Sequence, residues 1–420
     1  MDRTKNYIVV KTHIIVWRKK MKELKYINYF ESLLQEVNNE LVKQAQGEGK
    51  VAIGYTCHFV PEVLMNLPGC FSVRLRAPNI SGLDNSTYYM TNKTCQYARS
   101  ILECAIEGGY DFLDALNGSE TCCMMHRIPE HFETLKLVKE IKPSFYTTIM
   151  DVPFVTGEDA EKYYEEQLYN HLLKPLQEAY KIDISDKALM KAIEDHNEIS
   201  KIVREIGDFR KMDNSPITGY EFHLIQLVSE VCPHYLIKEK LLETLEEIKK
   251  RKVDVDKWYR TRIVLVGGEI DDPAFTKLLE DCGAFVVADR YCYGSLPGRD
   301  QITINEGETP LHAIARYYLN SSQCPRFMNK EKGDGRKTFI ADLVKEYNAN
   351  GVLVEQIKFC EYWIYERILD YQVLNNEMKI PTLTIERDYS VASVEQLRTR
   401  IQAFVESLES KKIKKEAGEL

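Results

Sequence analysis

The 420-residue sequence lacks any stretch close to the roughly 20 consecutive apolar residues that a membrane-spanning helix requires. It has no GxxxxGK[ST] phosphate loop and no paired clusters of cysteines about two to four residues apart, the spacing typical of structural zinc. Neither sign of charge dominates, because 64 acidic and 56 basic residues leave a formal net charge of −8. These absences argue against a membrane protein, a P-loop ATPase, a structural zinc protein and a general nucleic-acid-binding surface.

The sequence nevertheless contains eleven cysteines. Its opening, MDRTKNYIVVKTHIIVWRKKMKEL, has only short apolar runs broken by charge, so we expect no secretory signal and a cytoplasmic location. In that compartment thiols stay reduced and are available for packing, metal binding or redox chemistry. Four cysteines lie in apolar or helical patterns and are interpreted as packing residues: Cys70, Cys104, Cys232 and Cys282.

Strand-like apolar runs alternate with helical patterns in two separate parts of the chain. The runs cover residues 51–57, 70–78, 110–123, 144–153, 262–267, 284–289, 351–356 and 381–385. This alternation predicts an α/β protein with parallel sheets. Between the two parts, from residue 159 to about 252, the strand pattern disappears and a charged, helix-periodic pattern replaces it, which predicts a helical insert.

We therefore divide the chain into an N-terminal helical arm, a first α/β lobe, a helical domain and a second α/β lobe. Their predicted bounds are residues 1–50, 51–158, 159–258 and 259–420. The arm has apolar residues at helical spacing from Tyr26 to Gln46 and a glycine stop at Gly47 and Gly49, which predicts one amphipathic helix.

Several other cysteines fall where a parallel sheet binds ligands, just after its strands. Cys57, Cys122, Cys292 and Cys360 each follow an apolar strand-like run, and Cys95 begins a helical pattern. Helix N-termini favour thiolates. If the lobes face each other, cysteines 95 and 122 of the first can meet cysteine 360 of the second at one cleft. This arrangement indicates thiolate ligation of an iron–sulfur cluster, with one iron of a [4Fe–4S] cube left without a cysteine.

Spacing alone leaves open whether Cys122 or the adjacent Cys123 is the ligand. His58 and His126, each near a candidate cysteine, are candidate proton carriers, because the ordinary pKa of histidine, about 6.5, suits that task. Glu62, which follows Pro61 after the cysteine at 57, is a further candidate.

A series of stretches from about Gly54 to Phe404 resembles a known family. In chain order they are GYTCHFVPE, CQYARSILECAIEGGYDFLD, TCCMMHR, VGGEIDDP, VVADRYCYGS, NGVLVEQIKFC and IPTLTIERDYSVASVEQLRTRIQAF. Their order and spacing resemble the 2-hydroxyacyl-CoA dehydratase and benzoyl-CoA reductase family, with a subunit like component D of 2-hydroxyglutaryl-CoA dehydratase.

The resemblance implies two Rossmann-like lobes plus a helical domain, and a [4Fe–4S] cluster held by Cys95, Cys122 and Cys360. It implies a lyase subunit that acts on an acyl-CoA substrate. Water would be eliminated from an (R)-2-hydroxyacyl-CoA through a ketyl radical after one-electron activation. The expected partners are a related second subunit, in a heterodimer or homodimer, and an ATP-hydrolysing iron–sulfur activator.

Departures from the family pattern leave alternatives open. Cys123 stands where an aspartate is frequent, and Leu296 follows YCYGS where an arginine is common, so we assign no coenzyme A ligand. Cys57, Cys292 and Cys324 would raise the thiolates to six, the number used by the family's double-cubane [8Fe–9S] reductases. A benzoyl-CoA-type reductase and a non-catalytic scaffold or electron-relay subunit are further alternatives.

Overall fold

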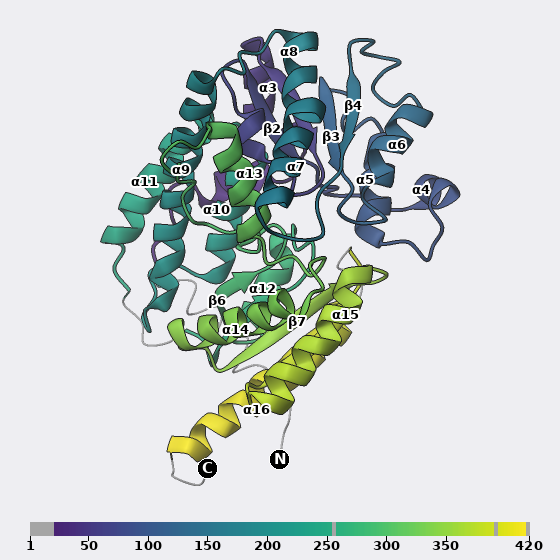
Figure 1. Ribbon diagram of the computed structural model, residues 1–420. Helices are drawn as coiled ribbons and strands as arrows, with labels where there is room; N and C mark the ends of the chain where they lie inside the picture. The colour runs from purple at the N-terminus through teal and green to yellow at the C-terminus, as the bar shows by residue number, and fades with distance from the viewer. Residues whose placement is uncertain (1–20, 254–257, 390–393, 417–420) are drawn as a thin grey trace.

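The computed structural model describes residues 21–253, 258–389 and 394–416. It contains two four-stranded parallel sheets (Figure 1), which confirms the predicted α/β class with two Rossmann-like lobes. The first sheet has the order β2-β1-β3-β4 and consists of β1 (Val51–Tyr55), β2 (Cys70–Arg74), β3 (Ala115–Ser119) and β4 (Tyr146–Met150). The second has the equivalent order β6-β5-β7-β8 and consists of β5 (Thr261–Val266), β6 (Ala284–Arg290), β7 (Gly351–Ile357) and β8 (Thr382–Arg387).

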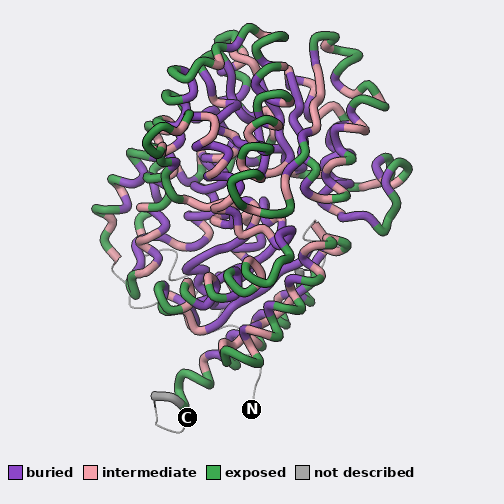
Figure 2. The backbone as a smooth tube through the Cα atoms, viewed as in Figure 1, coloured by how far each residue is buried: buried purple, intermediate pink, exposed green. Residues whose placement is uncertain are grey.

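Three neighbouring strands of the second sheet carry the core of that lobe. All residues of β5, β6 and β7 are buried, and in β5 and β7 the pairs Val264–Val352 and Val266–Val354 lie in register. Parallel strands covered on both faces read as nearly continuous apolar runs, which is why the sequence predicts them well. Figure 2 shows the buried backbone concentrated in the strands, with exposed residues on the surrounding helices.

Helices surround both sheets. Those of the first lobe are α4 (Asp84–Tyr89), α5 (Gln96–Ile106) and α6 (Arg127–Thr134). Those of the second are α12 (Pro273–Asp281), α13 (Pro310–Ser321), α14 (Lys330–Glu346), α15 (Glu361–Asp370), the π-helix η4 (Tyr371–Glu377) and α16 (Val394–Glu416). A short 3-10 helix, η1 (Glu62–Met65), follows β1. None of the described helices is long and apolar enough to cross a membrane.

From residue 151 to 253 the structure contains helices and no strand. These helices are α7 (Glu158–Leu168), η2 (Tyr169–Leu173), α8 (Lys174–Tyr180), α9 (Asp186–Asp208), η3 (Phe209–Lys211), α10 (Gly219–Val231) and α11 (His234–Lys250). Helix α10 packs on β2 of the first lobe and on β6 and α12 of the second. A capping box between Thr218 and Glu221 fixes its start. The helical segment is therefore anchored to both lobes.

The predicted single helix from Tyr26 to Gln46 is wrong. The structure has two helices, α2 (Ile27–Leu33) and α3 (Glu40–Gly47), because the side chain of Asn39 accepts hydrogen bonds from the N–H groups of Leu41 and Val42 and starts a new helix. Residues 1–20 of the predicted arm lie outside the described residues, and the division of the chain into domains stays a prediction.

The carboxyl edges of the two sheets face each other. Cys57 follows β1, Cys122 follows β3, Cys292 follows β6 and Cys360 follows β7. Arg74, at the end of β2, donates a hydrogen bond of 2.9 Å to the main-chain oxygen of Cys292. In the first sheet β2 and β3 lie on opposite sides of β1, and in the second sheet β6 and β7 lie on opposite sides of β5. Open α/β sheets bind ligands at such a change of direction, beyond the carboxyl ends of the strands.

A substitution at Gly219 can test the contact between α10 and the second sheet. A Cβ at this position would lie 2.7 Å from the main-chain oxygen of Val286. We expect Gly219→Ala to lower the free energy of unfolding by about 1–3 kcal/mol, because the helix must move off β6. Gly333 on α14 has nothing within 4 Å of a Cβ, so Gly333→Ala should leave stability unchanged or raise it by up to about 1 kcal/mol. Denaturant unfolding of both variants measures the difference, and equal effects would contradict the expected contact.

Candidate functional site

Two cysteines from different lobes meet at helix N-termini. Cys95 is the N-cap residue of α5, Cys360 is the N-cap residue of α15, and their thiols are hydrogen-bonded to each other. The hydrogen bond from Cys360 lowers the pKa of Cys95 against the effect of burial, and the N–H groups of Ala98 and Tyr97 lower it further. The same hydrogen bond, together with burial, raises the pKa of Cys360. Of the two thiols, Cys95 of the first lobe is therefore the one that loses its proton more easily.

Cys122 completes this group from the turn after β3. Its charge raises the pKa of Cys360, and it is half-buried against the apolar core of the first lobe. The adjacent Cys123 is exposed, and its Sγ donates a hydrogen bond of 2.7 Å to Oε2 of Glu361. Cys122 thus acts on Cys360, which in turn interacts with Cys95, whereas the side chain of Cys123 is bonded to Glu361. The role of Cys95, Cys122 and Cys360 as cluster ligands stays a prediction.

The other three candidate cysteines form a second group. Burial is the main cause that raises the pKa of Cys292, and the charges of Glu269, Cys324 and Cys57 raise it further. Burial and the charge of Cys57 raise the pKa of Cys324 to about 12. The two groups border a common region, because charges of both Cys122 and Cys324 act on the hydroxyl of Tyr362. All six candidate cysteines therefore gather between the carboxyl edges of the sheets.

The donor set at Cys95, Cys122 and Cys360 fits an iron–sulfur cluster. All three ligands are sulfur atoms, and main-chain N–H groups donate to two of them, as with Trp363 and Cys360. Such hydrogen bonds tune the potentials of clusters. Among the residues that the structure describes, no three His, Cys, Asp or Glu side chains converge closely enough to hold a single metal ion. A four-iron cluster is larger than one ion and takes thiolates that stand further apart.

Comparison with protein families matches residues 57–408 to the family described as 2-hydroxyglutaryl-CoA dehydratase, D-component. The chain belongs to this family. It is 25% identical over 388 residues to the (R)-phenyllactyl-CoA dehydratase beta subunit of Clostridium sporogenes, which covers 91% of this chain and 99% of that protein. It is 24% identical over 370 residues to the lactoyl-CoA dehydratase subunit beta of Anaerotignum propionicum, covering 86% and 92%. It is 20% identical over 374 residues to a benzoyl-CoA reductase subunit of Thauera aromatica, covering 87% and 92%. The family predicted from the sequence is confirmed.

In this dehydratase-family chain, a buried ion network fixes the helix that begins after Cys360. Arg336 on α14 donates two hydrogen bonds, of 2.8 and 2.9 Å, to the carboxylate of Glu366 on α15. Lys337 lies 3.1 Å from the same carboxylate, and Arg290 at the end of β6 lies 3.6 Å from it. Three cations around one buried carboxylate hold α15 against the second sheet, and with it the position of the Cys360 thiol.

The candidate proton carriers lie in different surroundings. His58 is buried, and its Nε2 lies 2.7 Å from Oγ of Ser322. Burial, with the charges of Arg74 and Arg326, lowers its pKa well below the ordinary value, so the ring is neutral. His126 stands at the start of α6, and its Nδ1 lies 3.6 Å from Oε2 of Glu120. The catalytic role of either histidine stays a prediction.

Glu62 has a partner that the sequence analysis missed. Its Oε1 lies 2.6 Å from Nδ1 of His196, which comes from α9 of the helical segment, 134 residues away. The only sequence signal was a histidine on the apolar face of α9, among the buried residues Ile193, Ile199 and Val203. Such a position more often signals packing than function, and no local motif joins it to Glu62.

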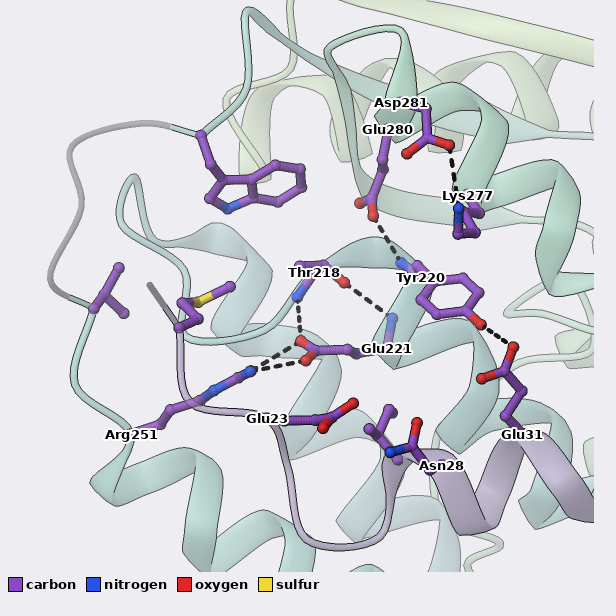
Figure 3. Close-up of a pocket in the computed structure, with 14 residues that line it drawn as sticks. Glu23, Asn28, Glu31, Thr218, Tyr220, Glu221, Arg251, Lys277, Glu280 and Asp281 are labelled. Atoms are coloured by element: carbon purple, nitrogen blue, oxygen red, sulfur yellow. Dashed lines mark hydrogen bonds and ion pairs between the residues drawn. The ribbon is translucent and has the colours of Figure 1, made fainter. Parts of the chain in front are cut away.

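A cavity of about 450 Å³ lies elsewhere, beside α2, α10 and α12. Figure 3 shows that its charged groups are directed at one another. Arg251 donates hydrogen bonds of 2.9 Å to both carboxylate oxygens of Glu221, and Tyr220 donates one of 2.8 Å to Glu31. Because these pairs close the wall of the cavity, we assign it no part in the chemistry of the cysteines.

Asp370, next to the network on α15, makes stability depend on pH. Burial and the charge of Glu366 raise its pKa from 3.8 to about 7. The folded protein therefore keeps a proton that the unfolded chain loses near its ordinary pKa of about 4, so stability falls as pH rises from about 4 to about 7. We expect Asp370→Asn to remove this dependence and to gain about 2–3 kcal/mol relative to wild type between pH 5 and pH 8.

Denaturant unfolding at the two pH values, at equal ionic strength, measures this gain. Asp342→Asn, at an exposed position on α14, is the control and should follow the wild type. An Asp370→Asn curve parallel to that of the wild type would show that this carboxyl does not titrate in the range.

Proposed function

We propose that this protein is an iron–sulfur subunit of a 2-hydroxyacyl-CoA dehydratase, with a [4Fe–4S] cluster on Cys95, Cys122 and Cys360. The observation that carries the proposal is the meeting of two thiols from the N-termini of α5 and α15, one from each lobe, with a third beside them. The proposed reaction removes water from an (R)-2-hydroxyacyl-CoA through a ketyl radical, after activation by one electron. A cluster bound there supplies one-electron transfer and Lewis acidity.

The residues of the chain have three tasks in this proposal. The lobes hold the thiols in a largely buried junction that limits the access of water, since Cys95 is buried and Cys360 half-buried. The ion network around Glu366 keeps α15, and so Cys360, in position. A proton must leave the substrate's β-carbon and the departing hydroxyl needs one, and Glu62, His58 and His126 are the candidate carriers.

The names of the relatives support a multi-subunit enzyme. The two dehydratase relatives are beta subunits, and the reductase relative is likewise one subunit of its enzyme. We therefore propose that the chain works with a related second subunit and with a separate ATP-hydrolysing iron–sulfur activator, which would supply the electron.

A double-cubane reductase is the second candidate function. The observation that favours it is the second group of Cys57, Cys292 and Cys324, which borders the first. Six gathered thiolates match an [8Fe–9S] cluster, and the likeness to a benzoyl-CoA reductase subunit is compatible with reductive chemistry. A cluster without substrate turnover would correspond to an electron-relay subunit.

The iron content separates these functions. We expect protein prepared without oxygen to contain about four irons and four acid-labile sulfides per chain, as one cube requires. Substitution of Cys95 or Cys360 by alanine should remove them, together with the EPR signal of the reduced protein. About eight irons that also depend on Cys57, Cys292 and Cys324 would establish the double cubane instead. Absence of iron under strict anaerobiosis would contradict both.

The neighbouring cysteines at 122 and 123 provide a matched pair. Cys122→Ala should lose iron, because this thiol lies beside Cys360, whereas Cys123→Ala should keep the full iron content, because its side chain is exposed and bonded to Glu361. Iron and sulfide analysis with EPR compares the two variants. Loss of iron in the Cys123 variant alone would show that Cys123, and not Cys122, is the ligand. Turnover of 2-hydroxyacyl-CoA substrates with an activator then tests the dehydratase reaction itself.

A further inference from the structure

A cavity of about 100 Å³ that is lined by several charged side chains lies where the first lobe, the helical segment and the second lobe meet. Glu62 and Arg74 line it from the first lobe, His196 and His234 from the helical segment, and Arg299 from the second lobe. A cavity of this size has room for a few water molecules. Its position puts charged groups of three parts of the chain around one small space.

Several buried polar atoms of this wall have no partner within the described protein. They include Nδ1 of His234, Oε1 of Gln226, Nε of Arg74 and Oε2 of Glu62. His234, Gln226 and Arg74 are each more than nine-tenths buried. Burying a polar atom without a hydrogen bond costs about 1–3 kcal/mol. Four such atoms around one cavity therefore indicate a site that exchanges protons or holds polar molecules rather than a packed core.

Hydrogen bonds link Glu62 in the cavity wall to the half-buried Ser200 on α9. Oγ of Ser200, which is half-buried, lies 3.3 Å from Nε2 of His196, whose Nδ1 lies 2.6 Å from Oε1 of Glu62. Both ring nitrogens of His196 are thus engaged, one by Ser200 and one by Glu62, and all three residues line the cavity. The second carboxylate oxygen of Glu62 makes no hydrogen bond of good geometry among the described residues, although the hydroxyl of Tyr318 is near enough to lower the pKa of this carboxyl.

The opposite wall of the cavity borders the second group of cysteines. His58 lines the cavity, and its Nδ1 lies 3.8 Å from Sγ of Cys57. Arg74, also in the wall, donates to the main-chain oxygen of Cys292. The cavity therefore stands between the surface of α9 and the junction where the cysteines gather.

We infer that the helical segment carries protons to the junction of the lobes through His196 and Glu62, so that reduction of the centre there is accompanied by uptake of a proton at Glu62. His196 is a positioning and proton-exchanging residue, since it contacts Glu62 and not the reacting atoms. The inference rests on the proposed iron–sulfur centre, and it holds for the dehydratase and for the reductase alike, because both need protons beside a reduced centre.

The transfer balances without a further reactant. When His196 carries its proton on Nδ1 alone, its Nδ1–H bond breaks as a bond forms between that hydrogen and Oε1 of Glu62. The electron pair of the broken bond stays on Nδ1, and the carboxylate becomes a neutral carboxyl. In the same transfer the lone pair of Nε2, which faces Ser200, takes up a proton from solvent, so the ring stays neutral and ends with its proton on Nε2. One proton from solvent thus compensates one electron from the activator.

The charges around Glu62 favour its anionic form before reduction. The titratable and charged groups that face it are His196 on α9, Glu230 on α10, His234 on α11, Tyr317 and Tyr318 on α13, Tyr55 on β1 and Arg74 on β2. Burial raises the pKa of Glu62, but the charge and hydrogen bond of His196, followed by the charge of His234, outweigh it, so the pKa is lowered. An added negative charge nearby moves this balance toward protonation.

EPR-monitored redox titrations of the iron-loaded chain between pH 5 and pH 9 test the inference. In wild type the midpoint potential should fall with rising pH over part of this range, by about 59 mV per pH unit, since each unit is a tenfold change in proton concentration and one electron is transferred. Glu62→Gln should abolish the slope. His196→Asn, whose amide can replace the Nδ1 donor without carrying a proton, should displace the sloping region to higher pH.

A second His–Glu pair supplies the control. Nδ1 of His312 lies 2.8 Å from Oε2 of Glu165, away from the cavity, so His312→Asn should behave as wild type. If the Asn variant at 196 fails to fold, His196→Gln takes its place. An identical pH dependence in wild type, Glu62→Gln and His196→Asn, with normal iron content, would overturn the relay and leave the proposed function intact. Absence of iron and of an EPR signal in wild type would instead overturn the proposed function, and the relay with it.

Discussion

The junction between the lobes depends on the buried guanidinium of Arg74. Arg74 is the last residue of β2 and is 2% exposed. Its side chain donates hydrogen bonds of 2.6 Å to Glu230 on α10 and of 2.9 Å to the main-chain oxygen of Cys292. A buried cation costs several kcal/mol unless it is paired, so these bonds require the first lobe, the helical segment and the second lobe to close together. The ring of Tyr293, 3.7 Å from the guanidinium carbon, closes the other side. The contacts of Arg74 therefore fix how far apart the carboxyl edges of the two sheets lie.

The shared topology of the sheets then determines where reactive groups can stand. Both sheets end their strands at the junction, so residues two or three positions after β1, β3, β6 and β7 meet there although they are far apart in sequence. Helices α5 and α15 begin at the same place, and their free N–H groups favour negative sulfur. Cysteines at these positions are thus gathered by the fold, and the N–H groups at the start of α5 also lower the pKa of Cys95.

This also explains which features the sequence could predict. The strands are buried on both faces and read as apolar runs, so local pattern was sufficient to predict them. Local pattern also put Cys95, Cys122 and Cys360 at strand ends or at a helix start, but it left open the choice between Cys122 and Cys123, and the role of these cysteines as ligands stays a prediction. The break between α2 and α3 was missed because apolar spacing continues across it, while one side-chain cap at Asn39 decides it. His196 was missed because its meaning comes from a residue 134 positions away.

Electron transfer and proton transfer in the proposed reaction use different parts of the fold. An electron added to a poorly solvated junction raises its negative charge, and in a medium of low polarity that charge is costly unless a cation or a proton arrives with it. The cations near the cysteines are already committed, Arg74 to Glu230 and Arg336 to Glu366, so their charge cannot follow the electron. A carboxylate with one unpartnered oxygen can take up a proton without a change in packing. Glu62 is such a group among the described residues, and its hydrogen bond to His196 connects it to Ser200 of the helical segment without crossing either sheet.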